Sequence, residues 1–365
     1  MCLPSFFYQR TSMKNIFYSF TILLSATYAL AQEEAYEKPR INFVNQLREQ
    51  NVDYVTIYYQ VPEDTIFTLH SLNISTQEFE SACAFGITLD TAFFESYSAQ
   101  ANEEHRLIID QASCKITKTT PHYAYGFAHI QNDNENYEII DARWTLMQTQ
   151  EQLFESYQTF LLCGITFSFF VENTNVTPHE LCTQMHQFLL NYKIPVEQSY
   201  HQPHTNQYVF SLKFAPALRM ADAYLMTLKL LTEFAQKENL TLYLQAPDET
   251  YAPTYLHLHL NSLTLPLKEN LFFDEEDDFL LSPKAYTLAH AILEQKEQAY
   301  AKLHTLAHTN ITHALGYHNN NYFITIPTRS YKLPPAIRIC LPHAQPTCNP
   351  YEVFAWIMQL MLKNW

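Results

Sequence analysis

The side chains of this sequence best suited to chemistry are histidines. His257 and His259 are two residues apart in a segment whose apolar and polar residues alternate as in a strand, so both side chains should lie on one face. His201 and His204 form a second close pair upstream. Imidazole nitrogens, joined by a thiolate such as that of Cys340, suit zinc or copper better than magnesium. Histidine pairs at this spacing are a weak signal for a metal site. The simpler interpretation, which we favour, is that these histidines are polar core and rim residues.

The composition excludes several other kinds of site. Only four of the 365 residues are glycines, and a phosphate-binding loop or a dinucleotide fingerprint needs several of them close together. No G-x-S-x-G segment is present, so the sequence lacks that signature of a serine hydrolase. The formal net charge is −15, which argues against nucleic acid as a partner, because nucleic-acid recognition needs a basic face. The same charge disfavours docking to an anionic membrane surface.

The first 31 residues have the features of a secretory signal peptide. Lys14 gives a charged start, an apolar run follows over residues 16–30, and small residues at Ala29 and Ala31 form a cleavage site. Met13 is an alternative start of translation. We therefore expect removal of residues 1–31, export to the periplasm or the exterior, and no membrane span in the processed chain. The alternative is a buried N-terminal helix in a cytoplasmic protein.

Six cysteines follow the predicted signal peptide, and none of them forms a C-x-x-C pair. A zinc ribbon or a thioredoxin-like redox motif is therefore not expected. An even number of cysteines in an exported chain permits disulfides, and free buried thiols are the alternative.

Residue patterning divides the chain into two blocks. Residues 41–140 alternate as short strands, interrupted by helical patterns at 41–49 and 76–84. From residue 145 onward, longer helices alternate with strands. The expected helices are 145–160, 178–192, 215–238, 283–305 and 350–363, and the expected strands are 162–171, 207–214, 240–246, 255–261, 322–327 and 336–341. The last helix has a clear start, because Asn349 is a good N-cap and Pro350 suits the first helical position.

A series of short motifs runs along both blocks in a fixed order. They are Gly86-Ile87-Thr88-Leu89-Asp90, Asp141-Ala142-Arg143, the segment 164–170, the segment 194–202, Gln207-Tyr208-Val209, the segment 217–222, Leu256-His257-Leu258-His259 and Asn349-Pro350-Tyr351. In order and in spacing they resemble the motifs of glutamine synthetases, over about residues 41–363. Each motif is weak alone, and the resemblance rests on their succession.

The resemblance implies an α+β fold. A β-grasp-like N-terminal domain would span residues 41–140. A catalytic-type α/β domain would span residues 145–365, with an antiparallel sheet that forms half of an open barrel flanked by helices. In the family, this sheet carries Mg²⁺ or Mn²⁺ and ATP, which phosphorylates the γ-carboxylate of glutamate before ammonia displaces the phosphate. The sequence stops at Trp365, before the extension that joins two rings in many members, so we expect a monomer or a small oligomer.

Carrying the family's residues over one by one indicates that the metal and nucleotide site has been lost. The positions of the metal-binding glutamates hold Thr166, Ser168, Gln202, Val209 and Cys340, and the histidine ligand is kept as His257. The positions that hold phosphate and substrate are Asn320, Thr325, Ala246 and Arg338, of which only Arg338 keeps the family's residue. Asp90 is kept at the position that helps to deprotonate ammonium. Magnesium exchanges its waters for carboxylate oxygens, and uncharged side chains do not offer that exchange.

Two functional hypotheses follow from the sequence. The first is an exported, non-catalytic glutamine synthetase-like protein without cofactor, which binds a small molecule or a protein, or acts as a scaffold. The second is an active enzyme. It would be either a divergent ATP-dependent carboxylate–amine ligase or a protein with a new metal site. That metal site would consist of His201, His204, His257 and His259, which the resemblance places on neighbouring strands.

Overall fold

The structure of the chain is a computed structural model. It describes residues 40–61, 69–89, 105–132, 141–248, 250–264, 269–305, 311–317, 319–327 and 337–365. The predicted signal peptide, residues 1–31, and the predicted site residue Asp90 lie outside the described residues. Among the helices in these ranges, none is long and apolar enough to cross a membrane. No disulfide joins the cysteines of the described residues.

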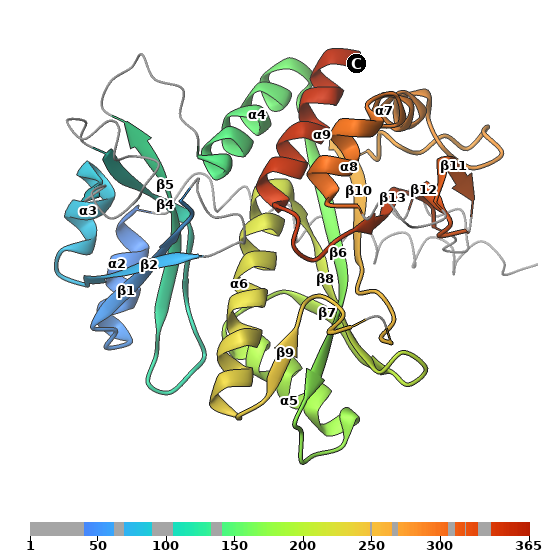
Figure 1. The fold of residues 1–365 in the computed structure, drawn as a ribbon. Helices are drawn as coiled ribbons and strands as arrows, with labels where there is room; N and C mark the ends of the chain where they lie inside the picture. The colour runs from blue at the N-terminus through green and yellow to red at the C-terminus, as the bar shows by residue number, and fades with distance from the viewer. Residues whose placement is uncertain are drawn as a thin grey trace, which may run out of the picture.

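The first block forms a five-stranded sheet with two helices on one face (Figure 1). Its elements are α2 (Arg40–Glu49), β1 (Tyr54–Tyr59), β2 (His70–Ser75), α3 (Phe79–Phe85), β3 (Ile87–Leu89), β4 (His105–Ile116) and β5 (Ala124–Asn132). The strand order is β2-β1-β5-β4-β3, in which only the central pair β1 and β5 is parallel. Ile57 of β1 packs in one core with Leu47 and Phe79 from the two helices, whereas Tyr58, on the other face, belongs to the core of the second block. The arrangement is consistent with the predicted β-grasp-like domain.

The second block is built on an eight-stranded, mostly antiparallel sheet that curls around a concave face (Figure 1). Its strands are β6 (Thr159–Glu172), β7 (Val196–Gln202), β8 (Gln207–Pro216), β9 (Thr241–Tyr243), β10 (Leu256–Thr264), β11 (Thr312–Tyr317), β12 (Tyr322–Ile326) and β13 (Ile339–Ala344). The order is β11-β12-β13-β10-β6-β8-β7, with β9 paired to β6. Only β11 and β12 run parallel. This confirms the predicted α+β fold with a curled, half-barrel sheet.

Helices cover the convex face of this sheet. They are α4 (Ala142–Tyr157), α5 (Pro178–Asn191), α6 (Ala217–Lys237), α7 (Pro283–Glu294), α8 (Lys296–Leu303) and α9 (Pro350–Asn364). Helix α6 lies along β6 and β8, and α9 packs against α4, α6 and α7 (Figure 1). Alternate strand residues, such as Phe167 of β6 and Leu258 of β10, are fully buried against these helices. The residues between them therefore face the concave side.

The element boundaries show where local patterning predicts structure well. The start of α9 is confirmed, since the Asn349 side chain accepts a hydrogen bond from the Tyr351 amide at 3.0 Å. The helix expected over 283–305 is instead two helices that meet at Gln295. Strand β7 was not expected, because its polar sequence has no apolar alternation and the strand is defined by its pairing with β8. Strand β11 was not expected either.

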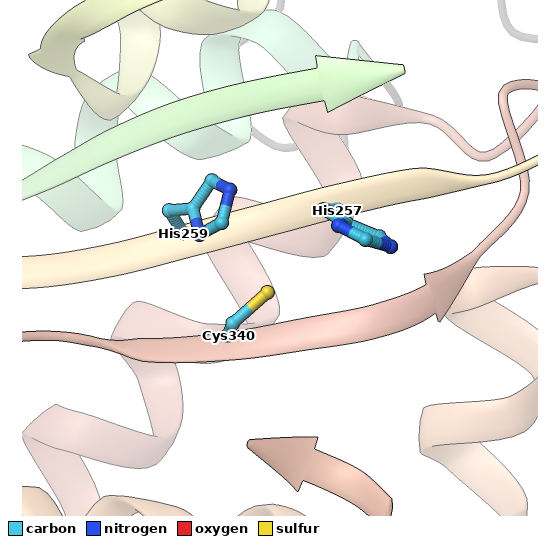
Figure 2. A group of neighbouring side chains, drawn as sticks. All are labelled: His257, His259 and Cys340. Carbon is cyan, nitrogen blue, oxygen red and sulfur yellow. The ribbon is translucent and has the colours of Figure 1, made fainter. Parts of the chain in front are cut away.

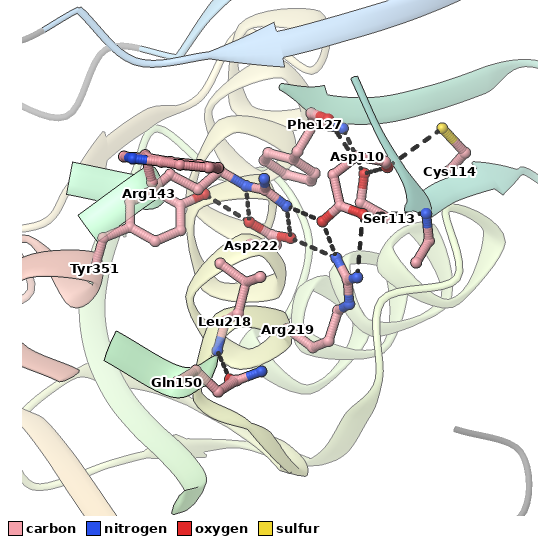
Figure 3. A network of polar contacts seen from close by, with 12 residues as sticks. Asp110, Ser113, Cys114, Phe127, Arg143, Gln150, Leu218, Arg219, Asp222 and Tyr351 are labelled. Atoms are coloured by element: carbon pink, nitrogen blue, oxygen red, sulfur yellow. Dashed lines mark hydrogen bonds and ion pairs between the residues drawn. The ribbon is translucent and has the colours of Figure 1, made fainter. Parts of the chain in front are cut away.

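A buried ionic network joins the two blocks (Figure 3). Arg143 of α4 binds both carboxylate oxygens of Asp222 on α6, each at 2.9 Å, and also the Asp110 carboxylate on β4 at 2.6 Å. Arg219 contacts the same Asp110 oxygen at 2.7 Å. Tyr351 donates its hydroxyl to Asp222 at 2.7 Å. The guanidinium of Arg143 is thus held between a strand of the first block and a helix of the second.

Three of the motifs that carry the resemblance meet in this network. They are the segments 141–143, 217–222 and 349–351, which supply Arg143, Asp222 and Tyr351. Asp141, from the first of these segments, caps α4 by accepting the Trp144 amide and also accepts the Ile130 amide of β5. These motifs therefore maintain the architecture. They do not bear on whether the concave face retains catalytic chemistry.

Candidate functional site

The concave face contains a cavity of about 300 Å³. Its lining residues come from β6, β7, β8, β10 and β12, from the segments that flank β12, and from the segment just before β13. They are Thr166, Gln198, Tyr200, Ser211, His257, His259, Asn320, Thr325, Ile326, Pro327 and Arg338. No acidic side chain is among these described lining residues, and Arg338 is the one with a permanent charge. This charge pattern suits a small anionic or polar molecule better than a cation that needs oxygen ligands.

Strand register brings most of the predicted metal-ligand positions onto this face. His257 of β10 lies opposite Thr166 of β6, and Ser168 lies opposite Val209 of β8. On the other side of β10, His259 lies opposite Cys340 of β13. Because these residues alternate with buried core residues, their side chains share the concave side of the sheet.

None of the replaced positions in this group offers a carboxylate oxygen, and several of the side chains already have protein partners. The hydroxyls of Thr166 and Ser211 are 2.8 Å apart. The hydroxyl of Ser168 accepts the Tyr255 amide at 2.9 Å, and Ser168 is fully buried. Val209 is also fully buried and is apolar. The side chains at these positions are therefore hydroxyls and one aliphatic group, which supply no formal negative charge.

The remaining predicted positions are more scattered. Gln202 is half-buried at the end of β7, and Ala246 is half-buried in the loop after β9. Asn320 is exposed in the turn between β11 and β12, where it lines the cavity. Thr325 is buried opposite Cys340. Arg338 lines the cavity from the segment before β13.

An aromatic ring supports one wall of the cavity. The Arg338 guanidinium lies 5.5 Å from the centre of the Phe214 ring, and the same ring lies 6.3 Å from the imidazole of His259. Gly164 makes room for it, since a Cβ there would come within 2.6 Å of Phe214 Cε2. The glycine at the start of the 164–170 motif is therefore required for close packing between β6 and this ring.

The structure brings together two of the four predicted histidines and Cys340, the cysteine named with them. The ligand atoms of His257, His259 and Cys340 all lie within 4.8 Å of one another, and no other such group occurs among the described residues. Figure 2 shows the Cys340 thiol directed from β13 toward the strand that carries both histidines.

The prediction that all four histidines lie on neighbouring strands is wrong. Strand β7, which carries His201, is separated from β10 by β8 and β6. His201 also pairs with Tyr208, whose side chain is in the core under the helices, so it lies on the opposite side of the sheet from His257. His204 is exposed in the turn after β7.

Burial favours the neutral forms of His257 and Cys340. It lowers the pKa of His257 to about 4, and the neighbouring His343 adds to that shift. Burial raises the pKa of the Cys340 thiol to about 12, although the charge of Arg338 and a hydrogen bond with Thr325 act in the opposite direction. His343 itself contacts the carbonyl oxygen of Tyr322 at 3.1 Å and so supports the turn that carries Asn320.

Sequence reasoning missed the lining residues of β7 and β8. Gln198, Tyr200 and Ser211 lie within or beside motifs that matched in order, but none of them occupies a position with a known role. One signal was available in the sequence. If residues 194–202 are taken as an edge strand, then Gln198, Tyr200 and Gln202 alternate along it and share one face.

Comparisons with known proteins agree with this architecture. Residues 165–363 match the family model described as glutamine synthetase, catalytic domain. Among solved structures, the glutamine synthetase of Plasmodium falciparum aligns with a TM-score of 0.77 and 14% identity, covering 90% of this chain and 75% of that one. Ligand-free GmaS aligns with a TM-score of 0.75 and 16% identity, covering 88% and 80%. A crystal structure described as a novel glutamine synthase homolog aligns with a TM-score of 0.72 and 16% identity, covering 86% and 82%. None of the curated proteins compared with the sequence matches it.

Proposed function

Because the chain belongs to the glutamine synthetase family, we propose that it is a member that has lost the magnesium–ATP site and serves as a binding or scaffold protein. The observation that supports this is the absence of any carboxylate among the described residues that line the concave cavity. The cavity instead presents Arg338, two histidines, and hydroxyl and amide groups, which favour a small anionic or polar molecule as the occupant.

The charge of the cavity lining does not suit magnesium–ATP. A triphosphate on this sheet needs divalent cations to neutralise it, and hard cations such as Mg²⁺ take oxygen ligands from carboxylates. Hydroxyls at Thr166 and Ser168 and the methyl groups of Val209 do not replace them. Guanidinium groups are also needed to hold the transferring phosphoryl group. Asn320 and Thr325 occupy two positions at which the family has arginines.

A second candidate is a divergent carboxylate–amine ligase, and one observation favours it. Among the metal, phosphate and substrate positions in the described residues, His257 and Arg338 keep the family's residue, and both line the cavity. A rebuilt site would have to use them together with ligands that the family does not use.

An assay of phosphate release separates the two candidates. With ATP, glutamate and ammonium in the presence of Mg²⁺ or Mn²⁺, we expect the rate to equal that of the His257→Ala variant. Removing a single preorganised charged contact already lowers turnover about 10²–10³-fold, and such losses in one site do not add simply. Phosphate release that requires both glutamate and ammonium, and that His257→Ala abolishes, would establish the ligase instead.

The predicted export remains part of this proposal. Cleavage after Ala31 would place the processed protein where ATP is scarce, which accords with a site that no longer binds it. N-terminal sequencing of the native protein should begin at Gln32, and full-length protein in the cytoplasm would refute export. A non-catalytic chain also has no need of an active site shared between subunits, and so we keep the proposal of a monomer or small oligomer.

A further inference from the structure

We propose that His257, His259 and Cys340 form a binding site for a soft transition-metal ion, Zn²⁺, with its fourth coordination position open to the concave cavity. The three side chains are the one group of potential metal ligands found together in the described part of the chain (Figure 2). The proposal does not rest on the loss of the magnesium–ATP site. Each of the two can fail without the other.

The pairing of β10 with β13 brings the three ligand residues close together. His259 and Cys340 are direct cross-strand partners on β10 and β13, and His257 is two residues along the same strand on the same face. Both strands lie inside the sheet, with β6 on one side and β12 on the other, so their spacing is held by hydrogen bonds on both edges. A site on such a scaffold has its ligands in position before the metal arrives.

The distances are close to those that zinc needs. Bonds of about 2.0 Å to nitrogen and about 2.3 Å to sulfur place tetrahedral ligand atoms roughly 3.3–3.5 Å apart. The ligand atoms of the group lie within 4.8 Å of one another. Rotation of the side chains has to close the difference of about 1 Å, because the strand pairing fixes the backbone.

The ligand types select the class of metal. One thiolate and two imidazoles are soft and intermediate donors, which favour zinc or copper over magnesium, calcium or manganese. The described lining of the cavity contains no acidic side chain that would attract a hard cation instead. Thr325, the cross-strand partner of Cys340 on β12, is hydrogen-bonded to the thiol and would orient it.

The open position faces the cavity, since His257 and His259 both line it. Three protein ligands with a fourth position left for water or a small molecule is the arrangement of zinc sites that bind exogenous ligands. Arg338 lines the same cavity. A small anion could therefore bind zinc with one oxygen and the guanidinium with another, as Arg338 and the metal both favour negative charge.

Cobalt substitution tests the site in the full-length protein. Metal-free protein titrated with Co²⁺ should bind one ion per chain, with the d–d bands of tetrahedral cobalt and a thiolate-to-cobalt charge-transfer band. Added Zn²⁺ should displace the cobalt, whereas Mg²⁺ should not. The Cys340→Ser variant should lose the charge-transfer band and bind Co²⁺ at least about 100-fold more weakly, given that even outer-shell changes cost 10–100-fold.

Two controls keep the result interpretable. His201→Gln removes a histidine on the other side of the sheet and should leave the spectrum and affinity unchanged. If Cys340→Ser does not fold, His259→Gln replaces it, and this variant should also bind Co²⁺ at least about 100-fold more weakly. Octahedral cobalt without a charge-transfer band, or a Co²⁺ affinity of the variant equal to that of the wild type, would overturn the proposal.

Discussion

Replacing Arg143 by methionine is expected to lower the free energy of unfolding by about 3–5 kcal/mol, because removing one partner of a buried ion pair leaves uncompensated charge in the protein. Arg143 is buried and makes three contacts with the carboxylates of Asp110 and Asp222. Chemical denaturation followed by circular dichroism measures the effect. The network joins the first block to the second. Unfolding of one block of the variant before the other would therefore also show that the network holds the two blocks together.

A matched control is available at an exposed ion pair. Lys302 of α8 and Glu352 of α9 are 2.5 Å apart, but both side chains are at least 32% exposed. Lys302→Met should therefore cost no more than about 1 kcal/mol. Equal losses in the two variants would mean that the buried network does not hold the blocks together.

The same network should make stability fall in acid. Burial raises the pKa of Asp110, but the charges of Arg219 and Arg143 outweigh burial and hold the pKa well below its usual range. A carboxyl group with a lowered folded-state pKa stabilises the protein above its unfolded-state pKa of about 4, and the stabilisation is lost as the pH falls below that value. The stability difference between wild type and Asp110→Asn should accordingly be full at pH 7 and shrink below about pH 4.

The sequence predicts the fold of this protein better than it predicts which side chains lie together. The order of the motifs predicted the fold, and the N-cap at Asn349 located the first residue of the last helix. Strand β7 was not predicted. It is an edge strand of polar residues, and its pairing with β8 leaves no pattern in its own sequence. The sequence could name His257, His259 and Cys340 as possible metal ligands, but it could not show which of the candidate side chains lie together. His259 and Cys340 are 81 positions apart in sequence, and only the order of the strands and their register make them neighbours.

Millimolar Mg·ATP is expected to leave the Tm of the protein unchanged. A nucleotide at 100 times its Kd stabilises the folded state by about 2.7 kcal/mol, which a thermal melt readily detects. We expect none of this stabilisation, because Thr166, Ser168, Val209 and Cys340 bring no formal charge to a site that must hold cations and a triphosphate. The melt should be recorded on metal-free and on zinc-loaded protein, since zinc alone would raise the Tm if it binds the histidine–cysteine group.

Isothermal titration of the metal-free, full-length protein with ATP in excess Mg²⁺, repeated with Mn²⁺, tests the loss of the nucleotide site most directly. An active glutamine synthetase titrated under the same conditions provides the positive control. The account predicts no heat of binding beyond dilution, and the same trace for wild type and His257→Ala. Saturable binding with a micromolar Kd that His257→Ala abolishes would contradict it, and would show that the concave face still holds a nucleotide.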